Sequence, residues 1–280
     1  MKKLFAILVV VGFGVFFMNS CQKASQEELL PTEQAQVGEF HSLGCNFLPA
    51  DEYAKIPVAK ELDIAVTKAV VNLSVPPVGN QGGEGSCVAW GTTYAGRSIN
   101  WHKTHVAAYS TSVNIFSPEY VYNQIKVSSS CTSGSYVTSG LSLLKSQGVC
   151  RWSLMPYTDV SCSTYPNTTQ KTDAAKYKIA SYSTVSRTTS AIKAQLAAGN
   201  PVIVAGPVNY AFEYLANGAV LSTFSGSSLG GHCYCVVGYD DTKGAFKFMN
   251  SWGTSWASSG FGWIKYGYEK TWWQEAYVIN

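Results

Sequence analysis

A glycine-rich run ends at a cysteine that could act as a nucleophile. Residues 81–87 read Gln-Gly-Gly-Glu-Gly-Ser-Cys, and a helical pattern follows over 88–102. A thiol at the start of a helix lies at the positive end of the helix dipole, which favours the thiolate and makes a stronger nucleophile. Taken alone, Cys87 would more often be a small buried apolar residue. Its interpretation as a nucleophile therefore depends on a base.

The chain offers four histidines as candidate bases. His102 and His105 would lie about 22 and 27 Å from Cys87 along a continuous helix, which is out of reach. They could form an i, i+3 metal pair, but no third ligand is near, so we expect a solvated helix end and no metal site. His41 belongs to a polar N-terminal stretch and is expected at the surface. His232 remains as the base by elimination.

The surroundings of His232 predict a strand over 233–238 that begins after two glycines. Because side chains alternate across a strand, His232 and Tyr234 should share one face. Cys233 and Cys235 should lie on the other face, in the core, where they are poorly placed to form a disulfide with each other.

A third polar group follows the next predicted strand, 245–249. Asn250 stands at its end, and Trp252 comes two residues later. An amide oxygen there can accept a hydrogen bond from an imidazole and fix the ring, while an indole shields that bond from water. In isolation, a turn asparagine beside a core tryptophan explains the same residues.

Taken together, these segments resemble the papain-like cysteine peptidases over residues 70–280. His232 lies 145 positions after Cys87, within the spacing of roughly 130–150 known for that family, and Asn250 lies 163 positions after Cys87. The resemblance rests on six segments: Pro-Pro-Val-Gly-Asn-Gln at 76–81, Gly-Ser-Cys at 85–87, Phe-Ser-Pro-Glu-Tyr at 116–120, Gly-His at 231–232, Asn-Ser-Trp-Gly-Thr at 250–254 and Gly-Phe-Gly at 260–262.

The resemblance implies hydrolysis of peptide bonds through a thioacyl-enzyme, without a cofactor or a metal. It assigns a role to each matching position: Cys87 nucleophile, His232 base, Asn250 orienting group, Trp252 its support, Gln81 oxyanion donor with the backbone N–H of Cys87, and Gly134, Ser135 and Gly231 substrate binding.

Two positions depart from the family pattern. An aromatic residue usually follows the nucleophile, whereas this chain has Val88, with Trp90 two positions further on. The cysteine three positions before the nucleophile is replaced by Glu84, so the usual disulfide is absent and Cys131 needs another partner or none. Neither change touches the acid–base chemistry, although Val88 could alter the groove wall and specificity.

The N-terminus predicts export. Lys2 and Lys3 precede an uncharged apolar run from Leu4 to Met18, which suits a secretory signal and is short for a membrane span. Ser20-Cys21 followed by polar residues resembles a bacterial lipoprotein signal. We therefore expect a protein of the bacterial cell envelope, anchored to the membrane by lipid at Cys21; an uncleaved signal anchor is the alternative.

Composition indicates a globular chain of 280 residues, 46% hydrophobic and 13% charged. Its net charge of +3 includes the two leader lysines, and no basic run follows, so a nucleic-acid partner is not expected. Helical patterns (88–102, from Ser117-Pro118, 139–147, 190–198) precede strand patterns (202–205, 233–238, 245–249, 262–266), and the Ser/Thr-rich stretches 128–139 and 181–190 suggest loops. We expect an α+β, two-lobed papain-like fold with the active site in the cleft.

The expected organisation has three parts: a signal peptide at 1–20, a tether and N-terminal extension at 21–65, and the peptidase domain at 66–280. The extension is short for an independently folded inhibitor. We expect it to act as a spacer packed against the peptidase, without a zymogen step, and residues 44–48 to be its most ordered part, with Cys45 a possible disulfide partner. The counter-hypothesis is that it blocks the cleft.

Two other functions fit the same residues. One is a cell-wall amidase or transferase that uses a similar Cys–His pair, against which Gln81 and the Asn250–Trp252 motif argue. The other is a silent peptide-binding module on the same scaffold, which is disfavoured because every catalytic position is filled. Peptide libraries and cell-wall fragments would separate these possibilities from a peptidase.

Overall fold

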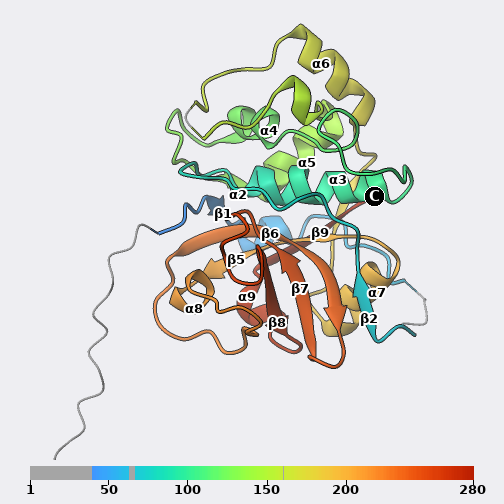
Figure 1. Ribbon diagram of the computed structural model, residues 1–280, viewed down its shortest axis with the longest axis vertical. Coiled ribbons are helices and arrows are strands. Elements are labelled where there is room, and N and C mark those ends of the chain that lie inside the picture. The colour runs from blue at the N-terminus through green and yellow to red at the C-terminus, as the bar shows by residue number, and fades with distance from the viewer. Residues whose placement is uncertain (1–39, 63–66, 160) are drawn as a thin grey trace, which may run out of the picture. The chain divides into compact units, whose positions relative to one another are not determined.

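A seven-stranded antiparallel sheet carries the candidate base near its centre (Figure 1). The structure, a computed structural model, describes residues 40–62, 67–159 and 161–280. The strand order is β4-β9-β5-β6-β7-β8, with β2 added alongside β6. The strands are β1 Cys45–Asn46, β2 Val70–Asn72, β3 Ser135–Tyr136, β4 Tyr182–Thr184, β5 Val202–Val208, β6 Gly230–Asp240, β7 Ala245–Met249, β8 Phe261–Lys265 and β9 Glu275–Ile279.

The helices between residues 87 and 174 gather on one side of this sheet, seen in green and yellow in Figure 1. The α-helices are α1 Ala50–Tyr53, α2 Cys87–Ala89, α3 Ser98–His102, α4 Pro118–Ile125, α5 Val137–Ser146, α6 Thr168–Ala174, α7 Thr189–Ala197, α8 Tyr210–Glu213 and α9 Glu269–Trp272. Short 3-10 helices cover Trp152–Leu154 and Ala175–Tyr177.

The helix that begins at the candidate nucleophile runs without interruption from Cys87 to His102. Its middle, Trp90–Arg97, is π-helical and joins α2 to α3. Every residue from Cys87 to Ile99 is buried, because this helix lies between the sheet and the other helices of its lobe. The first turn of this helix, and with it Cys87, is therefore held in place by packing on all sides.

Helix α4 begins as its sequence predicts. Ser117 caps the helix, since its Oγ accepts a hydrogen bond of 3.0 Å from the backbone N–H of Tyr120, and Pro118 occupies the first helical turn. Further along the chain, α7 has a cap of the same kind in Thr188, whose Oγ1 accepts from the N–H of Ala191.

Apolar side chains form two cores, one on each face of the sheet. Cys233 and Cys235 belong to the core shared with the helical lobe, and Tyr234 belongs to the second core with Phe212 and Trp252. His232 faces the second group, with its ring 5.8 Å from that of Phe212. The predicted alternation along this strand is confirmed.

The α+β fold and the helix-then-strand order are confirmed, with differences in extent. Strand β6 is longer than predicted, and β9 carried no prediction. Part of each predicted loop is regular: 128–139 contains β3 and the start of α5, and 181–190 contains β4. These short pieces are ordered by pairing with distant segments, β3 with β1 and β4 with β9, which local composition does not reveal.

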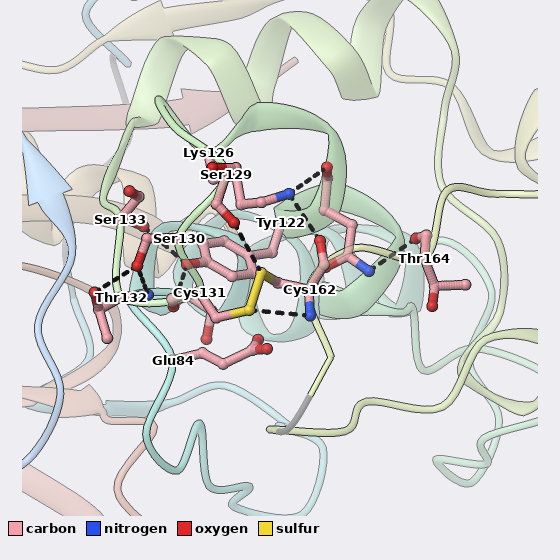
Figure 2. The surroundings of a disulfide bond; sticks show 12 residues. Glu84, Tyr122, Lys126, Ser129, Ser130, Cys131, Thr132, Ser133, Cys162 and Thr164 are labelled. Atoms are coloured by element: carbon pink, nitrogen blue, oxygen red, sulfur yellow. Dashed lines mark hydrogen bonds between the residues drawn. A yellow bond between two sulfur atoms is a disulfide. The ribbon is translucent and has the colours of Figure 1, made fainter.

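One disulfide joins Cys131 to Cys162 (Figure 2), so Cys131 has a partner other than residue 84. The other cysteines that the structure describes are reduced and buried, and Cys45 forms no disulfide. Glu84 lies next to the bridge with its carboxylate within 4.8 Å of both sulfurs. This group does not make a metal site, because bonded sulfurs are not thiolate ligands.

The predicted signal peptide and the lipidation residue Cys21 lie outside the described residues. Among the residues that are described, none of the helices combines the length and apolar character that crossing a bilayer requires.

Candidate active site

The candidate nucleophile is wholly buried at the first turn of α2. The Sγ atom of Cys87 is close to the backbone N–H groups of Cys233, on strand β6, and of Val88. Such donors stabilise a thiolate. The structure thus brings Cys87 next to the residue that follows His232, although 145 positions separate the two candidates in the chain.

The candidate base lies within hydrogen-bond distance of Asn250. The Nε2 atom of His232 lies 2.7 Å from Oδ1 of Asn250. The same Oδ1 accepts from the backbone N–H of Ser251 at 2.9 Å, which identifies it as the amide oxygen and makes Nε2 the donor. The Nδ1 atom of His232 therefore keeps a lone pair, and it is buried with no hydrogen-bond partner among the described atoms.

Trp252 covers this pair. Its ring stacks on that of His232 with centroids 4.6 Å apart, and the side chain is 1% exposed. The hydrogen bond between His232 and Asn250 is thereby kept from water, which strengthens it. The shielding role expected for the tryptophan agrees with this geometry.

Burial keeps both candidate catalytic groups neutral. It raises the pKa of Cys87 to about 12, against hydrogen bonds from backbone N–H groups that lower it. It lowers the pKa of His232 to about 4, although the bond to Asn250 acts in the opposite direction. In this state Cys87 is a thiol at neutral pH, which differs from the thiolate expected from the helix dipole. The reason is that no water reaches the sulfur.

The water is excluded by residues 40–48, which we name the covering segment. It begins beside Trp252, passes the candidate oxyanion donor, and pairs through β1 with β3 in parallel, Cys45 opposite Ser135. It then leaves the site at Leu48, whose N–H donates to the Oε1 of Glu275 at 2.6 Å. This segment is part of the same compact unit as the peptidase body.

Gln81 already holds a carbonyl group of the covering segment. Its Nε2 atom donates to the backbone oxygen of Ser42 at 2.9 Å and to that of Glu84 at 3.0 Å. Its Oε1 accepts from the hydroxyl of Ser251 at 2.7 Å, which fixes the direction of the amide. The side chain is thus oriented to donate toward the cleft, where a backbone carbonyl now stands.

The covering segment lies directly on glycines that the sequence assigned to substrate binding. The N–H of Gly44 donates to the carbonyl of Gly231 at 3.2 Å, and the N–H of Ser135 donates to the carbonyl of Gly44 at 2.9 Å. A Cβ atom on Gly44 would lie 2.1 Å from the oxygen of Gly85, and one on Gly231 would lie 2.1 Å from the oxygen of Cys45. Only bare backbone fits at these positions.

These contacts favour the hypothesis that the N-terminal extension blocks the cleft. The expectation that residues 44–48 are ordered and packed on the peptidase agrees with the structure. A pure spacer, however, would leave the cleft open, and the covering segment fills it. Local sequence patterns carry no sign of this, because the contacts join positions far apart in the chain.

His41 is partly exposed, in line with the surface position expected for it, but its ring makes specific contacts that the sequence did not predict. Its ring stacks on Trp252 with centroids 4.5 Å apart and an interplanar angle of 8°, and its Nδ1 lies 2.6 Å from Oε1 of Glu213. Sequence reasoning missed Glu213, since an acidic residue in a short amphipathic stretch carries no signal of its own. Of the other two histidines, His105 is exposed and His102 is half-buried at the end of its helix.

Sequence reasoning also missed Tyr157, which supports the turn before the nucleophile. Its hydroxyl lies 2.7 Å from the carbonyl oxygen of Gln81, 2.7 Å from Oγ of Ser86 and 3.1 Å from Oε2 of Glu84. This network takes the place of the disulfide that residue 84 would make in the family pattern. It fixes the backbone from which both the oxyanion donor and the nucleophile project.

Comparison with known proteins agrees with this geometry. A family model described as papain family cysteine protease matches residues 59–278. The chain is 28% identical over 188 residues to the gamete and mating-type specific protein A of Dictyostelium discoideum, and 33% identical over 88 residues to the cathepsin B-like CP1 of Giardia intestinalis. The alignments cover 66% and 30% of this chain but only 39% and 29% of those proteins.

Solved structures share the fold. Xylellain, a cysteine protease from Xylella fastidiosa, matches with a TM-score of 0.72 at 24% identity, over 87% of this chain and 98% of the other. Procathepsin B S9 from Trypanosoma congolense matches with a TM-score of 0.67 at 15% identity, over 85% of this chain and 87% of the other. At these identities the likeness concerns the fold alone.

Proposed function

The chain belongs to the papain family of cysteine proteases, and we propose that it hydrolyses peptide bonds with Cys87 as nucleophile and His232 as base. The observation that carries this proposal is the orientation of the His232 ring. Because Nε2 donates to Asn250, Nδ1 is the nitrogen left to accept a proton, and it is buried without a hydrogen-bond partner among the described residues.

The mechanism follows from these positions once the cleft is open. His232 Nδ1 takes the thiol proton, and the sulfur of Cys87 attacks the substrate carbonyl carbon. Gln81 Nε2 and the backbone N–H of Cys87 donate to the oxyanion. His232 then gives the proton to the leaving amine, and a thioester remains. Water attacks the thioester with His232 as base, which releases the acid and restores the thiol.

Activity against peptides tests this proposal directly. Purified protein should cleave members of a quenched fluorescent peptide library, and Cys87→Ala should abolish cleavage while the fold is kept. A low dose of an uncharged electrophile should label Cys87 first, with Cys150 as the matched buried control. Release of cell-wall fragments without peptide cleavage would instead favour the amidase or transferase, and peptide binding without cleavage would favour the silent module.

The described state is, in this proposal, the inactive one. The covering segment places the Ser42 carbonyl on Gln81 and the backbone of Gly44 across Gly85, so substrate backbone and covering segment compete for the same donors. Turnover then requires residues 40–48 to move out or to be cut. The short extension would thus do the work of an inhibitor without forming a domain of its own.

The remaining part of the proposal concerns location. The lysines, apolar run and Ser20-Cys21 sequence support export to a bacterial cell envelope and attachment by lipid at Cys21. Cys21→Ser should release the protein from the membrane fraction and remove the lipid mass. Unchanged fractionation would favour the uncleaved signal anchor.

A further inference from the structure

Glu213 is a buried acidic residue that forms no ion pair with a lysine or arginine among the described residues. It lies at the end of α8 with 4% of its surface exposed. Within the described residues, both hydrogen bonds to its side chain come from His41: the backbone N–H at 3.0 Å and Nδ1 at 2.6 Å, each to Oε1. An ionised carboxylate buried in this way is costly unless a donor or a cation meets it.

Its backbone, in contrast, is fully used by the body. The carbonyl oxygen of Glu213 accepts from Nε1 of Trp256 at 3.0 Å, and its N–H donates to the carbonyl of Asn209. The position of the carboxylate is therefore set by the peptidase body, whereas its partner comes from the covering segment. When that segment leaves the cleft, Glu213 stays in place without its partner.

The site that His41 occupies is bounded by the carboxylate of Glu213 on one side and by the ring of Trp252 on another. His41 lies flat on it, with an interplanar angle of 8°, and Trp252 also stacks on His232. A group held here thus touches both the carboxylate and the aromatic ring that covers the catalytic pair. A planar cation satisfies the two walls together, since it can stack on an indole and donate to a carboxylate.

We propose that Glu213 and Trp252 form a specificity subsite of the cleft for a cationic side chain of the substrate, best arginine, and that His41 occupies it in the covered state. This inference rests on the proposed peptidase function and names a substrate preference for it. The subsite lies beside Trp252, where the covering segment begins, whereas Ser135 pairs with the middle of the segment at Cys45.

The covering segment itself is the first probe. In the full chain, the rate of Cys87 alkylation by iodoacetamide reports how often the segment leaves. His41→Arg should keep the rate within about twofold of wild type, and His41→Gln should raise it about tenfold, the size expected from losing one charge-assisted bond. In a Glu213→Gln background, His41→Arg and His41→Gln should react alike. Equal rates for these two variants in the wild-type background would overturn the subsite.

Substrates provide the second readout. Peptides that differ at one position flanking the cleaved bond (Arg, Lys, Gln or Glu) are assayed with full-length His41→Gln, whose segment is loosened. At one position Arg should exceed Gln by about tenfold in kcat/KM, and Glu213→Gln should bring that ratio close to one. A preference that survives Glu213→Gln would refute the assignment.

The two readouts also separate this inference from the proposed function. Alkylation reads the subsite without turnover. Failure to cleave any peptide, combined with the expected alkylation series, would reject the peptidase and leave a cation-binding subsite. Cleavage without a charge preference, combined with equal alkylation rates, would reject the subsite and leave the peptidase.

Discussion

The hydrogen bonds of Gln81 orient its side chain as the proposed oxyanion role requires. Its amide oxygen is fixed by Ser251, so its nitrogen must face the cleft, where the Ser42 carbonyl now accepts from it. A substrate carbonyl oxygen would take that position after the covering segment leaves.

Gln81→Ala should therefore lower kcat by about 10²–10³, the usual cost of one such donor, with little change in KM. The same change weakens the covering segment, so rates are compared after the segment has been removed. Ser251→Ala is the matched control: it loses the orienting bond but keeps the donor, and should cost far less. A loss below threefold for Gln81→Ala would remove Gln81 from the mechanism.

Glu84 marks the departure from the family pattern beside the nucleophile. It lies under the Cys131–Cys162 bridge (Figure 2), and its Oε1 has no hydrogen-bond partner among the described atoms. Burial, followed by the charge of Glu119, raises the pKa of Glu84 to about 7, while the bond from Tyr157 acts against this. The carboxyl is therefore close to half protonated at neutral pH.

A pKa raised in the folded state makes this group stabilising below its ordinary value of 4.5 and costly as pH rises through 7. Between pH 5 and pH 8 the free energy of unfolding of the wild type should fall by about 1–2 kcal/mol, whereas that of Glu84→Gln should not show this fall. The measurement is thermal unfolding of both proteins at the two pH values, where the difference corresponds to about 2–8 °C. Parallel curves would show that Glu84 stays ionised in the folded protein.

The covering segment is held by contacts that depend on a neutral catalytic pair. The pKa of His232, about 4 in the covered state, lies below its ordinary 6.5, so covering is progressively weakened as pH falls from 6.5 to 4. The pKa of Cys87, about 12, lies above its ordinary 9, so covering is also weakened as pH rises above 9. The covered state should be firmest between these limits.

Acidification should consequently open the segment. The acid side can contribute up to about 3 kcal/mol, from the size of the His232 shift. The Ser135 amide, which donates to Gly44, should lose protection from hydrogen exchange between pH 6.5 and 4.5, after correction for intrinsic rates. The amide of Val204, inside the sheet, is the internal control. His232→Gln should abolish the pH effect; if it persists, another group controls opening.

Removal of the covering segment tests how the extension and the peptidase work together. The cut is best placed at Pro49, because α1 behind it is anchored: the Tyr53 hydroxyl bonds both the N–H and the carbonyl of Ala276. A chain that begins at Leu62 would lose this anchor as well as the cover.

Protein that begins at Pro49 should turn over peptides about 10–100-fold faster than protein that begins at Gln22, the gain expected if 90–99% of the longer chain is covered. Steady-state kcat with one fluorogenic peptide is the measurement. A third protein that begins at Phe40 keeps the segment without the tether and should remain slow. Equal rates for all three proteins would restore the spacer interpretation.

The sequence by itself determined which residues are the candidates for the catalytic chemistry. Helix, strand and turn signals around Cys87, His232 and Asn250 are local, and their order and spacing match one family. The helix start at Ser117 and the alternation along β6 followed from caps and side-chain period, which are also local properties.

Only the tertiary structure decided what meets across the cleft. The bond from Gln81 to Ser42 and the pair His41–Glu213 join positions 39 and 172 residues apart. The hydrogen bond from Tyr157 to Glu84, which stands where the family pattern has a disulfide, joins positions 73 residues apart. Such contacts depend on how the lobes pack and not on the composition of either partner. For the same reason, the neutral state of Cys87 followed from burial beneath residues 40–48 and could not be read from the helix that carries it.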